Sequence, residues 1–102
     1  KRRLRTGSLV DGIFVRNDMV ACFAMKAAGQ IGIQVPGQLK VIGFDDSSIS
    51  RLITPGLSTI QMRKERIAQA AIDMLTQMIA GRQPENRDFE TVLIERDSTR
   101  MM

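Results

Sequence analysis

The chain of 102 residues has no histidine, tryptophan or tyrosine, and it has only one cysteine, Cys22. A single cysteine excludes a disulfide within the chain and a zinc clamp built from paired cysteines, and it suits a reducing cytoplasm. No apolar run approaches the roughly 20 residues of a membrane helix, and residues 1–10 begin basic but lack the apolar core of a signal peptide. We therefore expect a soluble cytoplasmic protein that has no membrane partner and no metal or other cofactor.

Catalytic motifs are missing as well. The chain has no GxSxG, GxxxxGK[ST] or GxGxxG pattern, so acyl transfer, P-loop and dinucleotide chemistry lack their motifs. The adjacent carboxylates Asp45 and Asp46 could suggest glycoside hydrolysis. That reaction needs two carboxyl groups that face each other about 5 to 9 Å apart, and adjacent residues are poorly placed for this. We expect no enzyme.

Length and composition predict one compact folded unit. The apolar content of 43% and the charged content of 25% are near the average of globular proteins. The net charge of +4 raises the question of nucleic-acid binding, but the basic residues cluster only at the start of the chain, with no aromatic residues interleaved. We expect a solvated terminus here, the alternative being an arm that contacts DNA; the basic run comprises Lys1, Arg2, Arg3 and Arg5.

The apolar pattern alternates between strand-like and helix-like stretches. Short runs rich in β-branched residues predict strands, and apolar residues spaced three and four apart predict helices. The expected strands are residues 12–15, 41–44, 57–60 and 89–95, and the expected helical segments are residues 18–28, 49–53 and 62–79. This order favours an α/β fold with right-handed crossovers between parallel strands, and the run 41–44 is expected to be buried on both faces. The helix 62–79 is expected to pack in a core rather than to carry a cofactor.

Polar side chains stand where the first two predicted strands end. Asn17 and Asp18 follow the first strand, and Asp45 and Asp46 follow the second. Open parallel sheets bind ligands at the carboxyl ends of their strands, so these residues favour recognition of a small polar molecule. From the pattern alone, capping of the helical segments that follow them is the favoured role of Asn17 and Asp45. Asp18 and Asp46 are expected to be structural, because neighbours on an extended segment point to opposite sides, and they are the weaker ligand candidates.

Five short segments occur in the same order as in a known family. They are DGIFVRND (residues 11–18), GIQVP (32–36), VIGFDD (41–46), TPGLSTI (54–60) and ERDST (95–99). Over roughly residues 11–99 the chain resembles the C-terminal part of the effector-binding core of the LacI/GalR family of bacterial transcription regulators, whose fold is that of periplasmic sugar-binding proteins. The resemblance implies a three-layer sandwich on a parallel sheet, of which the chain holds the C-terminal portion.

The resemblance also implies that Asn17 and Asp45 contact the effector, commonly a sugar or nucleoside-like molecule. A carboxylate accepts hydrogen bonds from two adjacent hydroxyl groups, and an amide both donates and accepts, so the pair matches the edge of a sugar. For Asp45 the resemblance favours this role over that of a cap. For Asn17 the two roles are then balanced.

The expected helix 18–28 carries apolar residues around most of its circumference, so it must be covered on more than one side. The resemblance implies dimerisation through this helix and through residues 49–53. The candidate residues of a homodimer interface are Met19, Cys22, Phe23, Ile49, Leu52 and Ile53. The alternative is that they pack inside the monomer, where a buried free cysteine behaves as a small apolar residue.

The chain contains no helix-turn-helix headpiece, so operator DNA would be bound only through a part that it does not include. It is expected to be a fragment of a longer protein or a truncated product. The favoured function is the effector-sensing and dimerising part of a transcription regulator. Two alternatives are a fragment of a periplasmic sugar-binding protein that serves a transporter, and a module that mainly self-associates.

Overall fold

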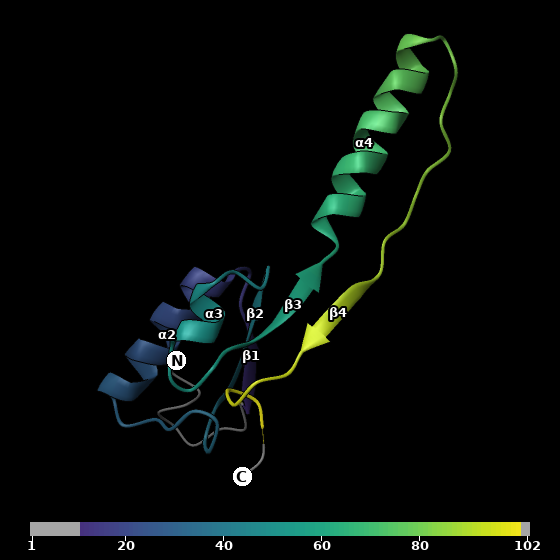
Figure 1. Ribbon diagram of the computed structural model, residues 1–102. Helices are drawn as coiled ribbons and strands as arrows, with labels where there is room; N and C mark the ends of the chain where they lie inside the picture. Colours follow the sequence, from purple (N-terminus) through teal and green to yellow (C-terminus); the bar gives the residue numbers. More distant parts are fainter. Residues whose placement is uncertain (1–10, 101–102) are drawn as a thin grey trace. The chain divides into compact units, whose positions relative to one another are not determined.

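The computed structural model describes residues 11–100, and the basic run at the start of the sequence lies outside them. The chain divides into two compact units. The helix unit is Met62–Val92, and the sheet unit comprises the residues on either side of it. The elements are β1 (Gly12–Phe14), α2 (Asp18–Gln30), β2 (Lys40–Phe44), α3 (Ile49–Leu52), β3 (Ser58–Met62), α4 (Lys64–Ile79) and β4 (Thr91–Ile94) (Figure 1). All seven predicted elements are present, with ends that differ from the prediction by a few residues.

The sheet has the strand order β1-β2-β3-β4, and both β1 with β2 and β2 with β3 pair in parallel. Phe14 lies opposite Ile42, and Phe44 lies opposite Ile60. The first three strands therefore end at one common edge. This confirms the predicted α/β class with parallel strands.

The core of the sheet unit lies between β2 and α2, which pack against each other. Val41 of β2, Ala21 of α2 and Leu57, just before β3, are completely buried. The prediction that β2 is buried on both faces is wrong for this chain. Only the alternate residues Val41 and Gly43 are buried, because α2 covers one face, whereas Ile42 and Phe44 on the other face are only half-buried.

Helix α2 buries one stripe of its surface and exposes another. Its buried residues are Asp18, Ala21, Met25 and Ala28, spaced three and four apart. Phe23 is 63% exposed and Met19 is 52% exposed. As predicted, the helix has more apolar surface than the sheet covers.

The helix unit consists of α4 and the segment that returns beside it. Asp73 of α4 accepts hydrogen bonds from Gln77 of the same helix and from Arg87 of the returning segment. Ala70 is the buried residue of the helix, while Leu75 and Met78 are exposed. The predicted core packing of this helix is therefore not observed within the described residues, because an extended segment covers less of a helix than a layer of side chains does. None of the helices in residues 11–100 is long and apolar enough to cross a membrane.

Candidate functional site

The carboxyl edge of the sheet brings the predicted ligand residues to neighbouring positions. Because β1 and β2 run parallel, the polar residues that follow them emerge at the same edge. The Val15 amide donates to the Ile42 carbonyl at 2.8 Å, which extends the pairing beyond the last residue of β1. Asn17 and Asp45 thus both follow the ends of adjacent parallel strands, and their contact with an effector stays a prediction.

Asn17 is the N-cap of α2. Its Oδ1 atom accepts a hydrogen bond from the Val20 amide at 2.8 Å, so the capping role foreseen for this residue is confirmed. A contact with a ligand would then fall to the side-chain NH₂ group, and this role of Asn17 stays a prediction.

Asp45 lies in a strained bend of the backbone. Its φ is 112°, and that of Asp46 is 52°, so two successive residues with side chains occupy the region that favours glycine. Asp45 is half-buried, and its amide donates to the Ile60 carbonyl of β3 at 2.8 Å. The N-cap position of α3 is Ser48, without a capping side-chain hydrogen bond, so the alternative of a cap for α3 does not fall on Asp45.

Asp18 is buried to 1% exposure and holds other parts of the edge together. Its Oδ1 accepts from the Thr59 hydroxyl at 2.6 Å, and its Oδ2 accepts from the Ser47 amide at 2.7 Å and lies 3.0 Å from the Ser47 hydroxyl. The carboxylate also passes so close to Gly43 that a Cβ atom there would collide with it. These contacts support the structural role expected for Asp18 and leave little of its carboxylate for a ligand.

Asp46 is engaged in a second polar cluster. Arg96 Nη2 donates to Asp46 Oδ1 at 3.0 Å, Gln61 Nε2 donates to Oδ2 at 3.0 Å, and the Ser50 hydroxyl lies 3.2 Å from Oδ1. Burial acts to raise the pKa of the Asp46 carboxyl, but the hydrogen bond and charge of Arg96, with the hydrogen bonds of Gln61 and Ser50, hold that pKa below its usual 3.8. The ionised side chain is 10% exposed, which supports a structural role here too.

Sequence reasoning assigned no role to Arg96 or Thr59. Both lie in segments that carried the family resemblance, and Thr59 sits inside a strand where alternation would allow a solvent-facing polar residue. In the fold Thr59 is completely buried, and Arg96 bonds to Asp46, which lies 50 positions earlier in the sequence. The one sequence feature that indicated a role for Arg96 was its position as a charged residue directly after the predicted strand 89–95.

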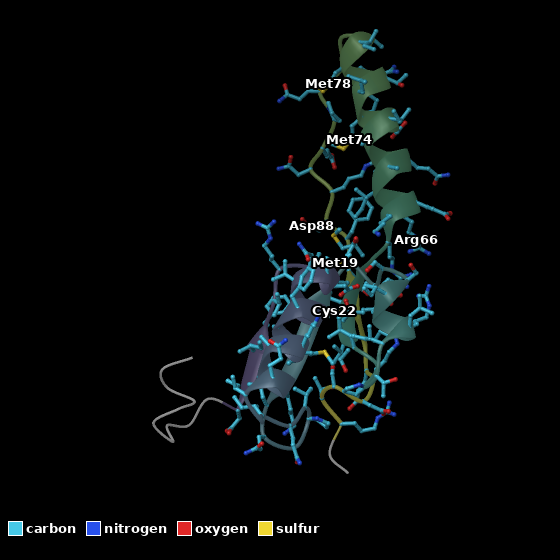
Figure 2. The ribbon with its side chains drawn as sticks, turned by 90° about the vertical axis from the view of Figure 1, so that its left-hand side faces the viewer. Met19, Cys22, Arg66, Met74, Met78 and Asp88 are labelled. Atoms are coloured by element: carbon cyan, nitrogen blue, oxygen red, sulfur yellow. The ribbon has the colours of Figure 1, made fainter. Side chains whose placement is uncertain are left out.

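A second candidate site is an apolar groove of about 640 Å³ between α2 and α3. Five predicted interface residues contribute to its lining, which comprises Met19, Cys22, Phe23, Met25, Lys26, Gly29, Ile33, Val35, Ile49, Ile53, Thr54 and Pro55. Figure 2 shows Met19 and Cys22 on α2, and Leu52, the sixth predicted residue, is 79% exposed outside the lining. The alternative of packing within the monomer holds in part, because Cys22 and Ile53 also contact the core.

Burial, and then the charge of Asp18, raise the pKa of the Cys22 thiol, which therefore stays neutral.

Comparison with known proteins places these features in a family. The family of the periplasmic binding protein-like domain matches residues 2–99. The chain is 36% identical over 88 residues to the HTH-type transcriptional repressor PurR of Erwinia tasmaniensis, covering 84% of this chain and 26% of that protein. The chain thus spans about a quarter of the length of the curated relatives it matches.

Two solved structures show the same fold. A periplasmic binding protein/LacI transcriptional regulator from Alkaliphilus metalliredigens, complexed with D-xylulofuranose, is 39% identical with a TM-score of 0.75, and the match covers 89% of this chain and 35% of that one. The lac repressor dimer bound to operator and the anti-inducer ONPF is 29% identical with a TM-score of 0.83, and the match covers 96% of this chain and 35% of that one.

Proposed function

Since the chain belongs to the periplasmic binding protein-like family, in the form found in LacI/GalR-type regulators, we propose that it supplies one side of the effector site and part of the dimer interface of a transcription regulator. The relatives named above are regulators, which supports this function over a transport protein. Operator DNA would be bound by parts of the protein outside this segment, and the protein would act in the cytoplasm. The chain itself would carry no catalytic step.

The observation that carries the effector proposal is the position and backbone conformation of Asp45 at the carboxyl edge of the sheet. Asp45 is half-buried in a strained bend that directly follows β2, at the edge where the parallel strands β1 and β2 both end. Strained backbone that persists in a folded protein gathers at ligand sites, where it holds a side chain in a required position. A carboxylate at this edge suits a ligand with adjacent hydroxyl groups.

The proposed ligand class is a sugar or a nucleoside-like molecule. A sugar is supported by the D-xylulofuranose bound to the relative from Alkaliphilus metalliredigens. Effector binding would change operator affinity only if the ligand prefers one of two conformations of the whole regulator. This segment would therefore contribute recognition of the effector, and the rest of the protein would share the response.

A thermal-shift screen of the full-length protein against sugars and nucleosides, D-xylulose and D-ribose among them, tests this function. A ligand that binds the folded state raises the melting temperature by mass action. For the compound that binds, Asp45→Ala is expected to weaken binding by about 2 kcal/mol, as the loss of a charged hydrogen-bond partner. The matched control is Asp97→Ala, because Asp97 is an exposed carboxylate in a surface ion pair with Arg100. Equal affinity of wild type and Asp45→Ala in calorimetry would remove Asp45 from the site.

A further inference from the structure

The bend at residues 45–47, here called the Asp45 bend, is held by contacts from residues that are not proposed to touch the effector. Two successive residues, Asp45 and Asp46, have positive φ values of 112° and 52°. Such backbone persists only where the surroundings fix it in several ways. The position of the Asp45 carboxylate therefore depends on the groups that fix this backbone.

Strand β3 holds the first two amides of the Asp45 bend. The Asp45 amide donates to the Ile60 carbonyl at 2.8 Å, and the Asp46 amide donates to the Thr59 hydroxyl oxygen at 3.2 Å. Helix α2 holds the third, because the Ser47 amide donates to the Asp18 carboxylate at 2.7 Å. Three consecutive backbone donors thus bond to two different elements.

Arg96 supplies the contact from the far end of the sequence. Its Nη2 donates to Asp46 at 3.0 Å, while its Nη1 donates to the Leu57 carbonyl at 2.9 Å and to the Ser50 hydroxyl at 3.0 Å. The Ser58 hydroxyl in turn accepts from the Arg96 amide at 2.7 Å, which fixes the backbone from which the guanidinium extends. Arg96 is 19% exposed at its side chain and Asp46 is 10% exposed, so water screens this ion pair less than a surface pair.

We propose that Arg96 and Asp46 are positioning residues that hold the Asp45 bend in the conformation in which Asp45 can meet the hydroxyl groups of an effector. Arg96 connects the bend, α3 and the residue just before β3 through one planar group with fixed donors. Without it, the partners left to the Asp46 carboxylate among residues 11–100 are the neutral groups of Gln61 and Ser50 and the less direct charge of Arg51 at 3.7 Å. The strained φ angles can then relax, and the Asp45 carboxylate moves away from its binding position. This inference rests on the proposed function for the role of Asp45 and on the structure alone for the fixing of the bend.

Hydrogen exchange of the three bend amides tests the fixing of the bend in the full-length protein without any ligand. Arg96→Gln and the nearly isosteric Asp46→Asn are each expected to speed exchange of these amides by about tenfold or more, because local opening becomes easier. The amides of Val15 and Ala21, bonded within the sheet edge and α2, should keep their rates. Arg96→Lys should restore part of the protection, since one donor can still reach Asp46.

Arg100→Gln is the matched control, because Arg100 forms an ion pair with Asp97 in which both side chains are more than half exposed. It should leave all these rates unchanged. Unchanged exchange at the bend in both test variants would overturn the inference, and so would a uniform increase over the whole sheet unit. If Arg96→Gln does not fold, Asp46→Asn decides the question alone.

Titration with D-xylulose, or with whichever sugar the screen shows to bind, separates this inference from the proposed function. Arg96→Gln should weaken binding by about tenfold, as expected for a misplaced binding group, while Arg100→Gln does not. If Asp45→Ala abolishes binding but Arg96→Gln leaves it intact, the positioning inference is wrong and the proposed function stands. If no sugar or nucleoside binds, the proposed function is wrong, and the exchange rates alone decide whether Arg96 and Asp46 fix the bend.

Discussion

At the scale of single residues, the site depends on one close approach and one charged pair. Gly43 lets the Asp18 carboxylate lie against β2, and the Arg96 guanidinium keeps Asp46 ionised within a largely buried cluster. Neither contact involves the residue proposed to touch the effector. The chemistry at the surface of the edge is therefore set by side chains beneath it.

Gly43→Ala is expected to lower the free energy of unfolding by about 3 kcal/mol, because overpacking a filled site displaces its neighbours. The added Cβ would collide with Asp18 and would lie 2.9 Å from Leu57 Cδ2. Gly29→Ala is the control, because a Cβ at this position in α2 meets nothing within 4 Å. It should stabilise the protein by about 0.5 to 1 kcal/mol, as alanine does in a helix. Equal urea midpoints for the two variants would contradict the tight contact.

Asp46 should make stability depend on pH in the acid range. Folding lowers the pKa of Asp46 below 3.8. The stability that this carboxylate contributes is therefore fully present above its unfolded pKa, and it is lost as the pH falls through its folded pKa. At pH 7, Asp46→Asn is expected to cost about 2 kcal/mol of unfolding free energy. At an acid pH below the folded pKa, the variant and the wild type should converge.

Urea unfolding at both pH values measures this difference. Asp97→Asn serves as the control, because the exposed pair of Asp97 with Arg100 contributes little. A difference between Asp46→Asn and wild type that stays constant with pH would show that the carboxylate charge does not stabilise the fold.

At the scale of elements, the sequence predicted every strand and helix of the described chain, because each has strong local periodicity and clear ends. It also placed Asn17 at the start of α2 and Asp45 after β2. The clusters under the edge could not be predicted in the same way. Arg96 follows β4 and Asp46 follows β2, and no local pattern reports a contact across 50 residues.

Substitutions at Asn17 separate its cap role from the proposed contact with an effector. Asn17→Ala removes the hydrogen bond to the Val20 amide and should cost about 1 kcal/mol of unfolding free energy. Asn17→Asp keeps a capping oxygen and should keep the stability of wild type. If the NH₂ group of Asn17 meets the effector, Asn17→Asp will nonetheless bind it more weakly in calorimetry. Equal affinity of Asn17→Asp and wild type would leave Asn17 as a cap only.

At the scale of the whole molecule, the two proposed surfaces share one structural unit. The carboxyl edge and the groove both involve the start of α2 and the segment that contains α3. Asp18 and Met19 are neighbours on α2, yet one is buried under the edge and the other lines the groove. A change in the angle between α2 and α3 would therefore alter both the carboxyl edge and the groove.

The groove is proposed to pair with its own copy in a homodimer. Phe23 is 63% exposed on its rim, and an isologous contact would cover this ring with the partner's groove. Phe23→Asp is therefore expected to shift the full-length protein from dimer to monomer in size-exclusion chromatography with light scattering, by placing a charge in a desolvated interface. Val20→Asp is the matched control, because Val20 is 42% exposed on the same helix but does not line the groove. If Phe23→Asp stays dimeric, or if Val20→Asp dissociates to the same extent, the interface does not lie in the groove and α2 meets its partner through another face.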